Sequence, residues 1–210
     1  MFEQMRSALG ITKNIDILDH CYSLAPLEQQ NAFKKICDIE SEAMKTQVPQ
    51  PGLLKLMEYL EERNIPKAIC TRNFDAPVTH LLQTFIPYIK FAPIVTRSFQ
   101  PPKPSPAGIL HIARSWGLKK KNELNEESED TGSMIMVGTY EHTVSDSIDD
   151  LTAGYRAGTA TVLISNETNA HLATHEYCDL VIETLDKLIE VLENGFTARI
   201  KKEDKFGNLD

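Results

Sequence analysis

Three polar clusters follow apolar stretches of this sequence and contain side chains that phosphate-ester chemistry needs. In chain order they are Thr71-Arg72-Asn73, Lys103, and the acids Asp146 and Asp150. Hydrolysis of a phosphate ester requires a nucleophile, a cation that offsets the phosphate charge, and donors that position the phosphoryl oxygens. The three clusters offer a hydroxyl, an amide, cationic groups and carboxylates. None is specific singly, but their order and spacing together are informative.

The acid pair Asp146 and Asp150 stands four residues apart across the start of a helix predicted at Asp149–Ala157. This spacing suits Mg²⁺, a hard cation that takes oxygen ligands, usually one or two carboxylates with phosphate and water. A structural interpretation fits equally well. In that interpretation Asp146 caps the helix while Asp149 and Asp150 complement its dipole.

The basic and hydroxyl groups also have two interpretations. Lys103 stands between prolines, so its backbone is held while its ammonium group can neutralise a phosphate. Thr71 offers a hydroxyl at a strand end, and Arg72 and Asn73 offer contacts to substrate or phosphate. Taken singly, a solvated surface lysine and a Thr-Arg-Asn turn are the more ordinary interpretations.

The elements that must position these clusters alternate strand with helix after a helical segment at 1–47 and a proline-rich hinge at 48–52. Helices are predicted at 53–62, 75–85, 105–116, 149–157 and 185–192, and strands at 67–71, 91–95, 134–137, 161–164 and 180–182. Residues 119–133 are expected to form a solvated loop. The alternation predicts an α/β fold with a doubly wound parallel sheet and helices on both faces. Ligands of such sheets bind at the carboxyl ends of the strands, where the clusters would converge.

The composition is that of a soluble globular protein of 210 residues, 41% hydrophobic and 25% charged. A net charge of -8 argues against nucleic acid or an anionic membrane as the main partner. No apolar run approaches the roughly 20 residues of a membrane span, and the first residues lack the apolar stretch of a signal peptide. A cytoplasmic location is therefore expected.

The four cysteines are Cys21, Cys37, Cys70 and Cys178. They form no CxxC pair and are expected to be reduced thiols, several of them buried.

Taken together, the clusters resemble three motifs of the haloacid dehalogenase-like (HAD) hydrolases of the phosphoglycolate phosphatase/β-phosphoglucomutase type. The matching stretches, within residues 49 to 193, are ICTRN ending at Asn73, PPKPSPAGILHIARSWGL containing Lys103, and a split VG…DSIDD containing Asp146 and Asp150. The resemblance implies a HAD-like Rossmannoid core at 48–195, a partial α-helical cap at 1–47 and a flexible tail at 196–210.

The resemblance also implies a Mg²⁺-dependent phosphatase that acts on a small phosphorylated metabolite through an aspartyl-phosphate. The motifs carry no information on which metabolite this is, or on the oligomeric state. The implied roles are catalytic for Thr71 and Lys103, substrate-binding for Arg72 and Asn73, and metal-binding for Asp146 and Asp150.

The first departure from the family's pattern concerns the nucleophile. The family carries it in an Asp-x-Asp-x-Thr motif at the end of a first, central strand, and no Asp-x-Asp occurs in this sequence. Asp16 and Asp19, three residues apart on a predicted helix, are interpreted as solvated. Without that strand, the two strands that end at Thr71 and Gly138 lose a ladder partner. Each buried backbone group left unpaired would lower the stability of the fold by roughly 1–3 kcal/mol. The chain is expected either to fold poorly alone or to pair those two strands directly.

The second departure is the seven-residue stretch Thr139–Ser145, which separates Gly138 from Asp146. Without it the sequence reads VGDSIDD in register. The stretch is expected to move Asp146 and impair an octahedral Mg²⁺ site, and Glu141 or His142 is a minor candidate replacement ligand. Because both departures fall at motif positions, we expect either an imperfect gene model or a degenerate paralogue.

The sequence leaves two main functions open. The first is a HAD-like phosphatase in a truncated and inactive form. The alternative is a pseudo-phosphatase that acts as a non-catalytic binding or regulatory protein. A dinucleotide-binding protein is disfavoured because no Gly-x-Gly-x-x-Gly follows any predicted strand.

Overall fold

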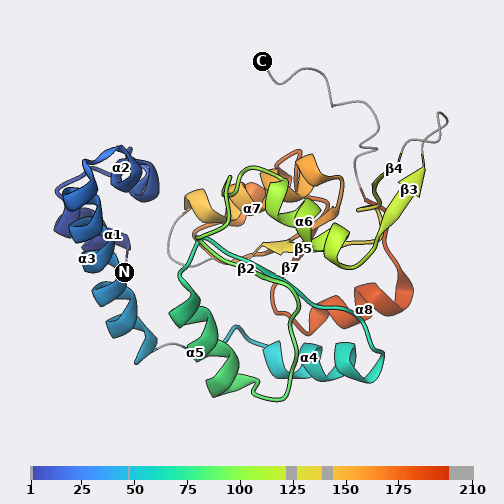
Figure 1. Ribbon diagram of the computed structural model, residues 1–210. Coiled ribbons are helices and arrows are strands. Elements are labelled where there is room, and N and C mark those ends of the chain that lie inside the picture. Colours follow the sequence, from blue (N-terminus) through green and yellow to red (C-terminus); the bar gives the residue numbers. More distant parts are fainter. Residues whose placement is uncertain (1, 47, 122–126, 139–143, 199–210) are drawn as a thin grey trace. The chain divides into compact units, whose positions relative to one another are not determined.

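The computed structural model describes residues 2–46, 48–121, 127–138 and 144–198 (Figure 1). The chain divides into two compact units. The first comprises Met1–Pro49 with Phe74–Pro87, and we refer to it as the helical unit. The second comprises Gln50–Asn73 with Tyr88–Asp210, and we refer to it as the α/β unit.

In its described residues the helical unit contains four helices, α1 (Phe2–Leu9), α2 (Ile17–Ser23), α3 (Pro26–Met44) and α5 (Asp75–Phe85). Pro26 occupies the first turn of α3, where its missing N–H costs no hydrogen bond. Asp16 is the N-cap of α2, and its Oδ1 accepts hydrogen bonds from the backbone N–H groups of Leu18 (2.8 Å) and Asp19 (3.1 Å). Asp16 thus satisfies two donors of the first helical turn while remaining half-buried, and Asp19 is exposed, as predicted.

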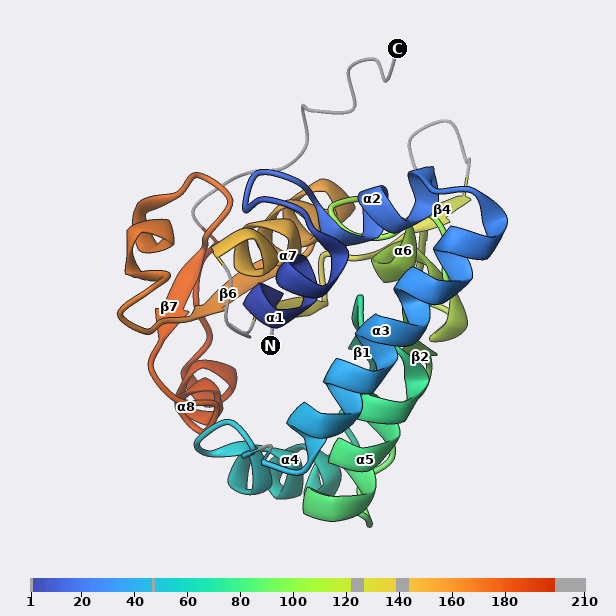
Figure 2. The same ribbon diagram turned by 90° about the vertical axis from the view of Figure 1, so that its left-hand side faces the viewer.

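Apolar packing joins α5 to the N-terminal helices, and α5 lies alongside α3 in Figure 2. The ring of Phe33 on α3 meets the ring of Phe74, the residue before α5, edge-on at 6.1 Å between centroids. The core of the unit consists of Met5, Ile17, Cys21, Ala32 and Ile36. The helical unit of the structure thus includes α5, which the predicted boundary at residue 47 leaves with the core.

In the described part of the α/β unit, five strands form two parallel sheets. The strand β1 (Ile69–Cys70) pairs with β2 (Ile94–Val95), and β6 (Ala160–Ile164) pairs with β5 (Ile135–Gly138) on one side and β7 (Leu180–Ile182) on the other. The α/β class and the parallel strands are confirmed. In the described residues the strands fall into two hydrogen-bonded sheets rather than one.

Helices cover both faces of these strands, as predicted. In Figure 1, α6 (Ala107–Ser115) and α7 (Val144–Ala157) lie on one side, and α4 (Leu53–Glu62) and α8 (Lys187–Asn194) on the other. A short 3-10 helix, Ala170–Thr174, precedes β7. Cys70 of β1 and Met136 of β5 pack against one apolar cluster. The buried members of this cluster come from β2, α6, α7 and the residue before β5: Val95, Ile109, Ile112, Ala113, Met134, Ala153 and Ala157. Both sheets therefore rest on the same layer formed by α6 and α7.

The predicted loop at 119–133 is only partly a loop. Its ends form an antiparallel pair, β3 (Lys119–Lys121) and β4 (Glu127–Glu129), in which Lys119 stands opposite Glu129. Opposite charges facing each other across two strands stabilise the pairing, so the charge density that suggests a loop is also compatible with strands. Arg114 on α6 donates two hydrogen bonds to Glu129 Oε1, at 2.9 and 2.6 Å.

Direct pairing of the strands that end at Thr71 and Gly138 is not seen. Within the described residues β1 has β2 as its ladder neighbour, and β5 has β6. That expectation is wrong, whereas folding of the chain in isolation stays a prediction. No helix among the described segments is long and apolar enough to cross a membrane. Most of the predicted tail at 196–210 lies outside the described residues.

Candidate functional site

The first side of the site is the turn after β1. Thr71 extends the ladder by one bond, because its backbone N–H donates to the Val95 carbonyl at 2.8 Å. The chain then turns, and the N–H of Asn73 donates to Thr71 Oγ1 at 3.1 Å. The interpretation of Thr-Arg-Asn as a turn is thus correct for the local structure. This turn holds Thr71 at the carboxyl end of β1.

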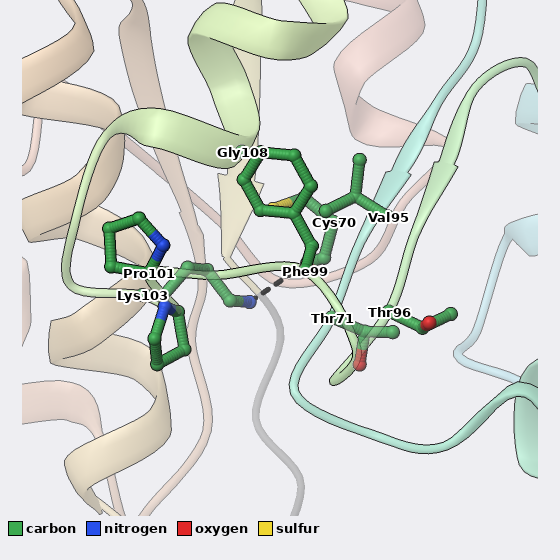
Figure 3. Close-up of a pocket in the computed structure, with 9 residues that line it drawn as sticks. Cys70, Thr71, Val95, Thr96, Phe99, Pro101, Lys103 and Gly108 are labelled. Carbon is green, nitrogen blue, oxygen red and sulfur yellow. Dashed lines mark hydrogen bonds between the residues drawn. The ribbon is translucent and has the colours of Figure 1, made fainter.

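The second side is the proline-rich loop before α6. The Nζ of Lys103 donates to the Cys70 carbonyl at 2.9 Å (Figure 3). It also forms an ion pair with Asp150. The side chains of Lys103 and Asp150 are each only 10% exposed. The interpretation of Lys103 as a solvated surface lysine is therefore wrong. Lys103 and Thr71 line one pocket, together with Cys70 and Phe99.

The third side is the start of α7. The helix begins at Val144, five residues before the predicted start, so Asp146 stands inside the helix and not at its cap. Its side chain lies outside the described residues. Asp149 forms an ion pair with Arg72 at 2.5 Å, and Asp150 reaches Lys103. Of the predicted site residues, Thr71, Arg72, Asn73, Lys103 and Asp150 are thus brought to one end of the strands.

Two glycines allow the helices to approach this closely. A Cβ added to Gly138 at the end of β5 would lie 3.2 Å from the Cβ of Asp150. A Cβ on Gly108 in α6 would lie 2.9 Å from the Cys70 sulfur. A larger residue at either position would push α7 or α6 away from the strand ends.

Two curated proteins are similar to the chain over most of its length, although no family model matches it. It is 40% identical over 201 residues to an uncharacterised hydrolase of Saccharomyces cerevisiae, covering 92% of this chain and 84% of that protein. It is 31% identical over 188 residues to a haloacid dehalogenase-like hydrolase domain-containing protein of Arabidopsis thaliana, covering 87% of this chain and 68% of that protein. The chain belongs to the haloacid dehalogenase-like hydrolases.

Solved structures agree with the HAD-like fold. A hydrolase from Pseudomonas syringae superposes with a TM-score of 0.66 at 18% identity, covering 93% of this chain and 89% of that one. A HAD-superfamily hydrolase of subfamily IA from Geobacter sulfurreducens superposes with a TM-score of 0.52 at 14% identity, covering 91% and 86%. The predicted family and fold are therefore confirmed.

Cys70 lines the pocket of this HAD-like chain, but its thiol is not set up as a nucleophile. Burial raises its pKa, the Lys103 cation opposes that shift, and the Asp150 carboxylate adds to it. The reactive form of cysteine is the thiolate. A raised pKa keeps Cys70 protonated at neutral pH, so it serves as packing under the site.

The described residues do not assemble a Mg²⁺ site. They contain no group of three or more His, Cys, Asp or Glu side chains that could hold a metal ion. The two described acids of the predicted loop, Asp149 and Asp150, each face a cationic side chain. The pairing of Asp146 with Asp150 as metal ligands therefore stays a prediction.

Two further charged residues contribute to the site, and the sequence reasoning did not select them. Asp149 is the partner of Arg72. Arg97, in the loop after β2, is buried and contacts the backbone of the turn after β1. The available signal for Arg97 was its position, because the polar stretch Thr96-Arg97-Ser98 follows a strand just as the selected clusters do.

A second hollow lies at the opposite, amino ends of β1 and β2. Its lining residues are Glu61, Asn64, Ile65, Pro66, Lys67, Lys90, Ala92 and Trp116. Lys67 is held there by Glu61 at 2.7 Å, and the indole N–H of Trp116 donates to the Ala92 carbonyl at 2.6 Å. Because α/β sheets bind ligands at the carboxyl ends of their strands, the Thr71–Lys103 pocket is the better candidate site.

Proposed function

We propose that this HAD-like chain binds the phosphate group of a small phosphorylated metabolite, as the phosphoryl-holding part of a phosphatase site. The observation that carries the proposal is the meeting of Thr71 and Lys103, distant in sequence, in one pocket at the carboxyl end of β1. A fixed ammonium group and a fixed hydroxyl are the donors that a phosphoryl oxygen requires.

The chemistry of the two groups is complementary. The ammonium group of Lys103 carries three N–H donors. It is oriented by hydrogen bonds that it donates to the Cys70 carbonyl and to the Asp150 carboxylate. Its charge offsets that of a phosphate in a mostly buried location, where electrostatic attraction is stronger than in bulk water. Thr71, in the turn after β1, supplies a hydroxyl donor to the same pocket. Arg72 and Asn73, in the same turn as Thr71, are proposed as further contacts to the substrate.

We propose further that this 210-residue chain does not turn substrate over. The 210 residues contain no Asp-x-Asp, and the described carboxylates nearest to Lys103 and Arg72 are in ion pairs with them. Mg²⁺ would supply additional charge neutralisation in a family phosphatase. Because the described residues do not fit a metal site, the magnesium dependence stays a prediction and no step depends on it.

Titration calorimetry with inorganic phosphate tests the binding. Phosphate is expected to bind the purified chain, and Lys103→Met and Thr71→Val are each expected to weaken binding by roughly tenfold, as for the loss of one hydrogen bond to a charged group. Lys67→Met is the matched control, because Lys67 has a similarly buried side chain but lies at the opposite end of β1. Equal losses in all three variants would contradict the proposed site.

A non-catalytic binding or regulatory role is the second candidate, and the missing Asp-x-Asp favours it. Incubation of the chain with p-nitrophenyl phosphate, with and without Mg²⁺, separates the two. Phosphate binding without release of nitrophenol would support the binding role, and Mg²⁺-dependent release would establish the enzyme. The net charge of -8 supports the further proposal that the partner is neither nucleic acid nor an anionic membrane. The cytoplasmic location stays a prediction.

A further inference from the structure

Arg97 is a buried cation next to the candidate site, with 7% of the residue exposed. Its Nε donates to the Arg72 carbonyl at 2.7 Å, and its backbone N–H donates to the Asn73 carbonyl at 3.0 Å. Both acceptors belong to the turn that carries Thr71. A guanidinium group stays charged at any physiological pH, and its burial is costly unless its donors are used. Arg97 therefore ties the loop after β2 to the turn after β1.

The contact with the Arg72 carbonyl reaches Thr71 through a single peptide group. The C=O of Arg72 and the N–H of Asn73 belong to one planar trans peptide and point in opposite directions. The N–H of Asn73 donates to Thr71 Oγ1 at 3.1 Å. A hydrogen-bond chain thus runs from Arg97 Nε through the peptide to the hydroxyl oxygen. A charged donor at one end polarises the peptide and strengthens the bond at the other.

This chain determines how the Thr71 hydroxyl can be used. A hydroxyl has one proton to donate and two lone pairs that accept. The oxygen is already an acceptor from Asn73, which limits the directions left for its O–H. Among the described contacts no acceptor is recorded for that proton, and Thr71 lines the pocket that contains Lys103. The hydroxyl is therefore held as a donor toward an anion in the pocket.

We propose that Arg97 is a positioning residue that fixes the Thr71 hydroxyl for phosphate binding through the Arg72–Asn73 peptide. The inference rests on the proposed phosphate site and adds to it a residue that does not touch the ligand. A purely structural arginine would hold the two loops together, and its loss would weaken folding without a specific effect through Thr71.

The test combines phosphate titration with the amide signal of Asn73 in isotope-labelled protein. Arg97→Met keeps the aliphatic stem and removes the donors, and Arg97→Lys keeps the charge but moves it off the Arg72 carbonyl. Both are expected to speed hydrogen exchange at the Asn73 amide, by roughly tenfold in the methionine variant, and to weaken phosphate binding by a similar factor. Arg114→Met is the control, since Arg114 contacts Glu129 on β4, and it should leave both readouts unchanged.

A double-mutant cycle separates positioning from a structural role. In a Thr71→Val background, Arg97→Met is expected to cost less than twofold further in phosphate affinity, because its effect passes through the hydroxyl that is already gone. Additive losses would overturn the inference, as would an unchanged Asn73 amide in Arg97→Met. If Arg97→Met fails to fold, the same two measurements are made on Arg97→Lys and on its combination with Thr71→Val, and the same outcomes support or overturn the inference. Absence of phosphate binding in the unmodified protein would instead overturn the proposed function, while the Asn73 amide would still report whether Arg97 orders the turn.

Discussion

The two parallel sheets of the α/β unit are held in place in different ways. The central strand β6 has a ladder neighbour on each side, and its Val162 and Leu163 are 0% exposed. The strand β1 has two residues, one described neighbour and only partial burial. The candidate site is built on β1, the less buried of the two. Its geometry therefore depends on polar contacts from Lys103 and Arg97 more than on apolar packing.

Polar residues also serve different purposes in the two sheets. Within β6, the Thr161 hydroxyl donates to the Tyr177 carbonyl at 2.5 Å and accepts from the Asp179 N–H at 3.2 Å. All of its described partners belong to the segment that leads into β7, so the network aligns two strands. In the turn after β1, the described hydrogen bonds give the Thr71 hydroxyl one partner, the Asn73 N–H, and Thr71 lines a pocket. A threonine enclosed by partners indicates structure, and one that faces a pocket indicates binding.

The largest difference between the sheets is expected from truncating their apolar side chains. Leu163→Ala should lower the free energy of unfolding by about 3–4 kcal/mol, because it leaves a cavity in a fully enclosed strand. Ile69→Ala in β1 should cost about 1 kcal/mol, because Ile69 is only half-buried. Urea unfolding at an unchanged m-value measures both. Similar losses for the two variants would show that β1 is as deeply packed as β6.

The second effect concerns the charges that hold the site together. Lys103→Met leaves the Asp150 carboxylate mostly buried without its cation, and it should lower the free energy of unfolding by about 3 kcal/mol. Lys103→Met combined with Asp150→Leu should recover most of that loss, because neither charge is then left buried alone. Urea unfolding of the single and double variants gives the coupling. If the double variant is no more stable than Lys103→Met, the ion pair is not the cause of the loss.

A third effect compares the two threonines directly. Thr161→Val leaves the Tyr177 carbonyl and the Asp179 N–H without the hydroxyl and should cost about 1–2 kcal/mol. Thr71→Val should cost no more than about 0.5 kcal/mol, because water can replace the hydroxyl in a partly exposed turn. Thermal unfolding of both variants is the measurement. A large loss in Thr71→Val would mean that Thr71 supports the fold as well as the pocket.

The sequence predicted the parts of this arrangement that depend on local pattern. It located Thr71, Lys103 and Asp150 at the carboxyl ends of strands, because apolar runs that alternate with helices predict parallel strands whose ends share an edge. It also predicted the bounds of α5 and β7. These features follow from periodicity and turn residues, which are visible within a few positions of each other.

The remaining features depend on contacts between distant segments. The early start of α7 has a local signal that was overlooked, since Ile148 and Leu151 share one helical face and belong to the same apolar cluster. The inward direction of the Arg97 side chain has no local signal in the sequence. Its Nε donates to the Arg72 carbonyl and its backbone N–H to the Asn73 carbonyl, both in the turn after another strand. The packing of α5 against α3 likewise needs the contact of Phe33 with Phe74, which no local pattern in either segment specifies.

The smallest effect is expected at the antiparallel pair β3–β4. The ion pair of Arg114 with Glu129 there resembles that of Lys103 with Asp150 in chemistry but not in burial. The hydrogen bond from Arg114 lowers the pKa of Glu129 in the folded protein. A lowered carboxyl pKa contributes stability above the unfolded value, near 4.3, and that stability is lost as pH falls through the folded pKa. Because Arg114 is largely exposed, the contribution should not exceed about 0.5 kcal/mol.

Comparison of the wild-type chain with Glu129→Gln by urea unfolding between neutral pH and pH 3 measures this contribution. The wild type should be slightly more stable at neutral pH, and the difference should shrink to zero as Glu129 becomes protonated. High salt should reduce it at neutral pH, whereas the loss in Lys103→Met should persist in salt because that pair is mostly buried. A Glu129 effect that matched Lys103→Met in size and salt resistance would contradict the view that burial, rather than the pairing of charges, makes the contacts around β1 strong.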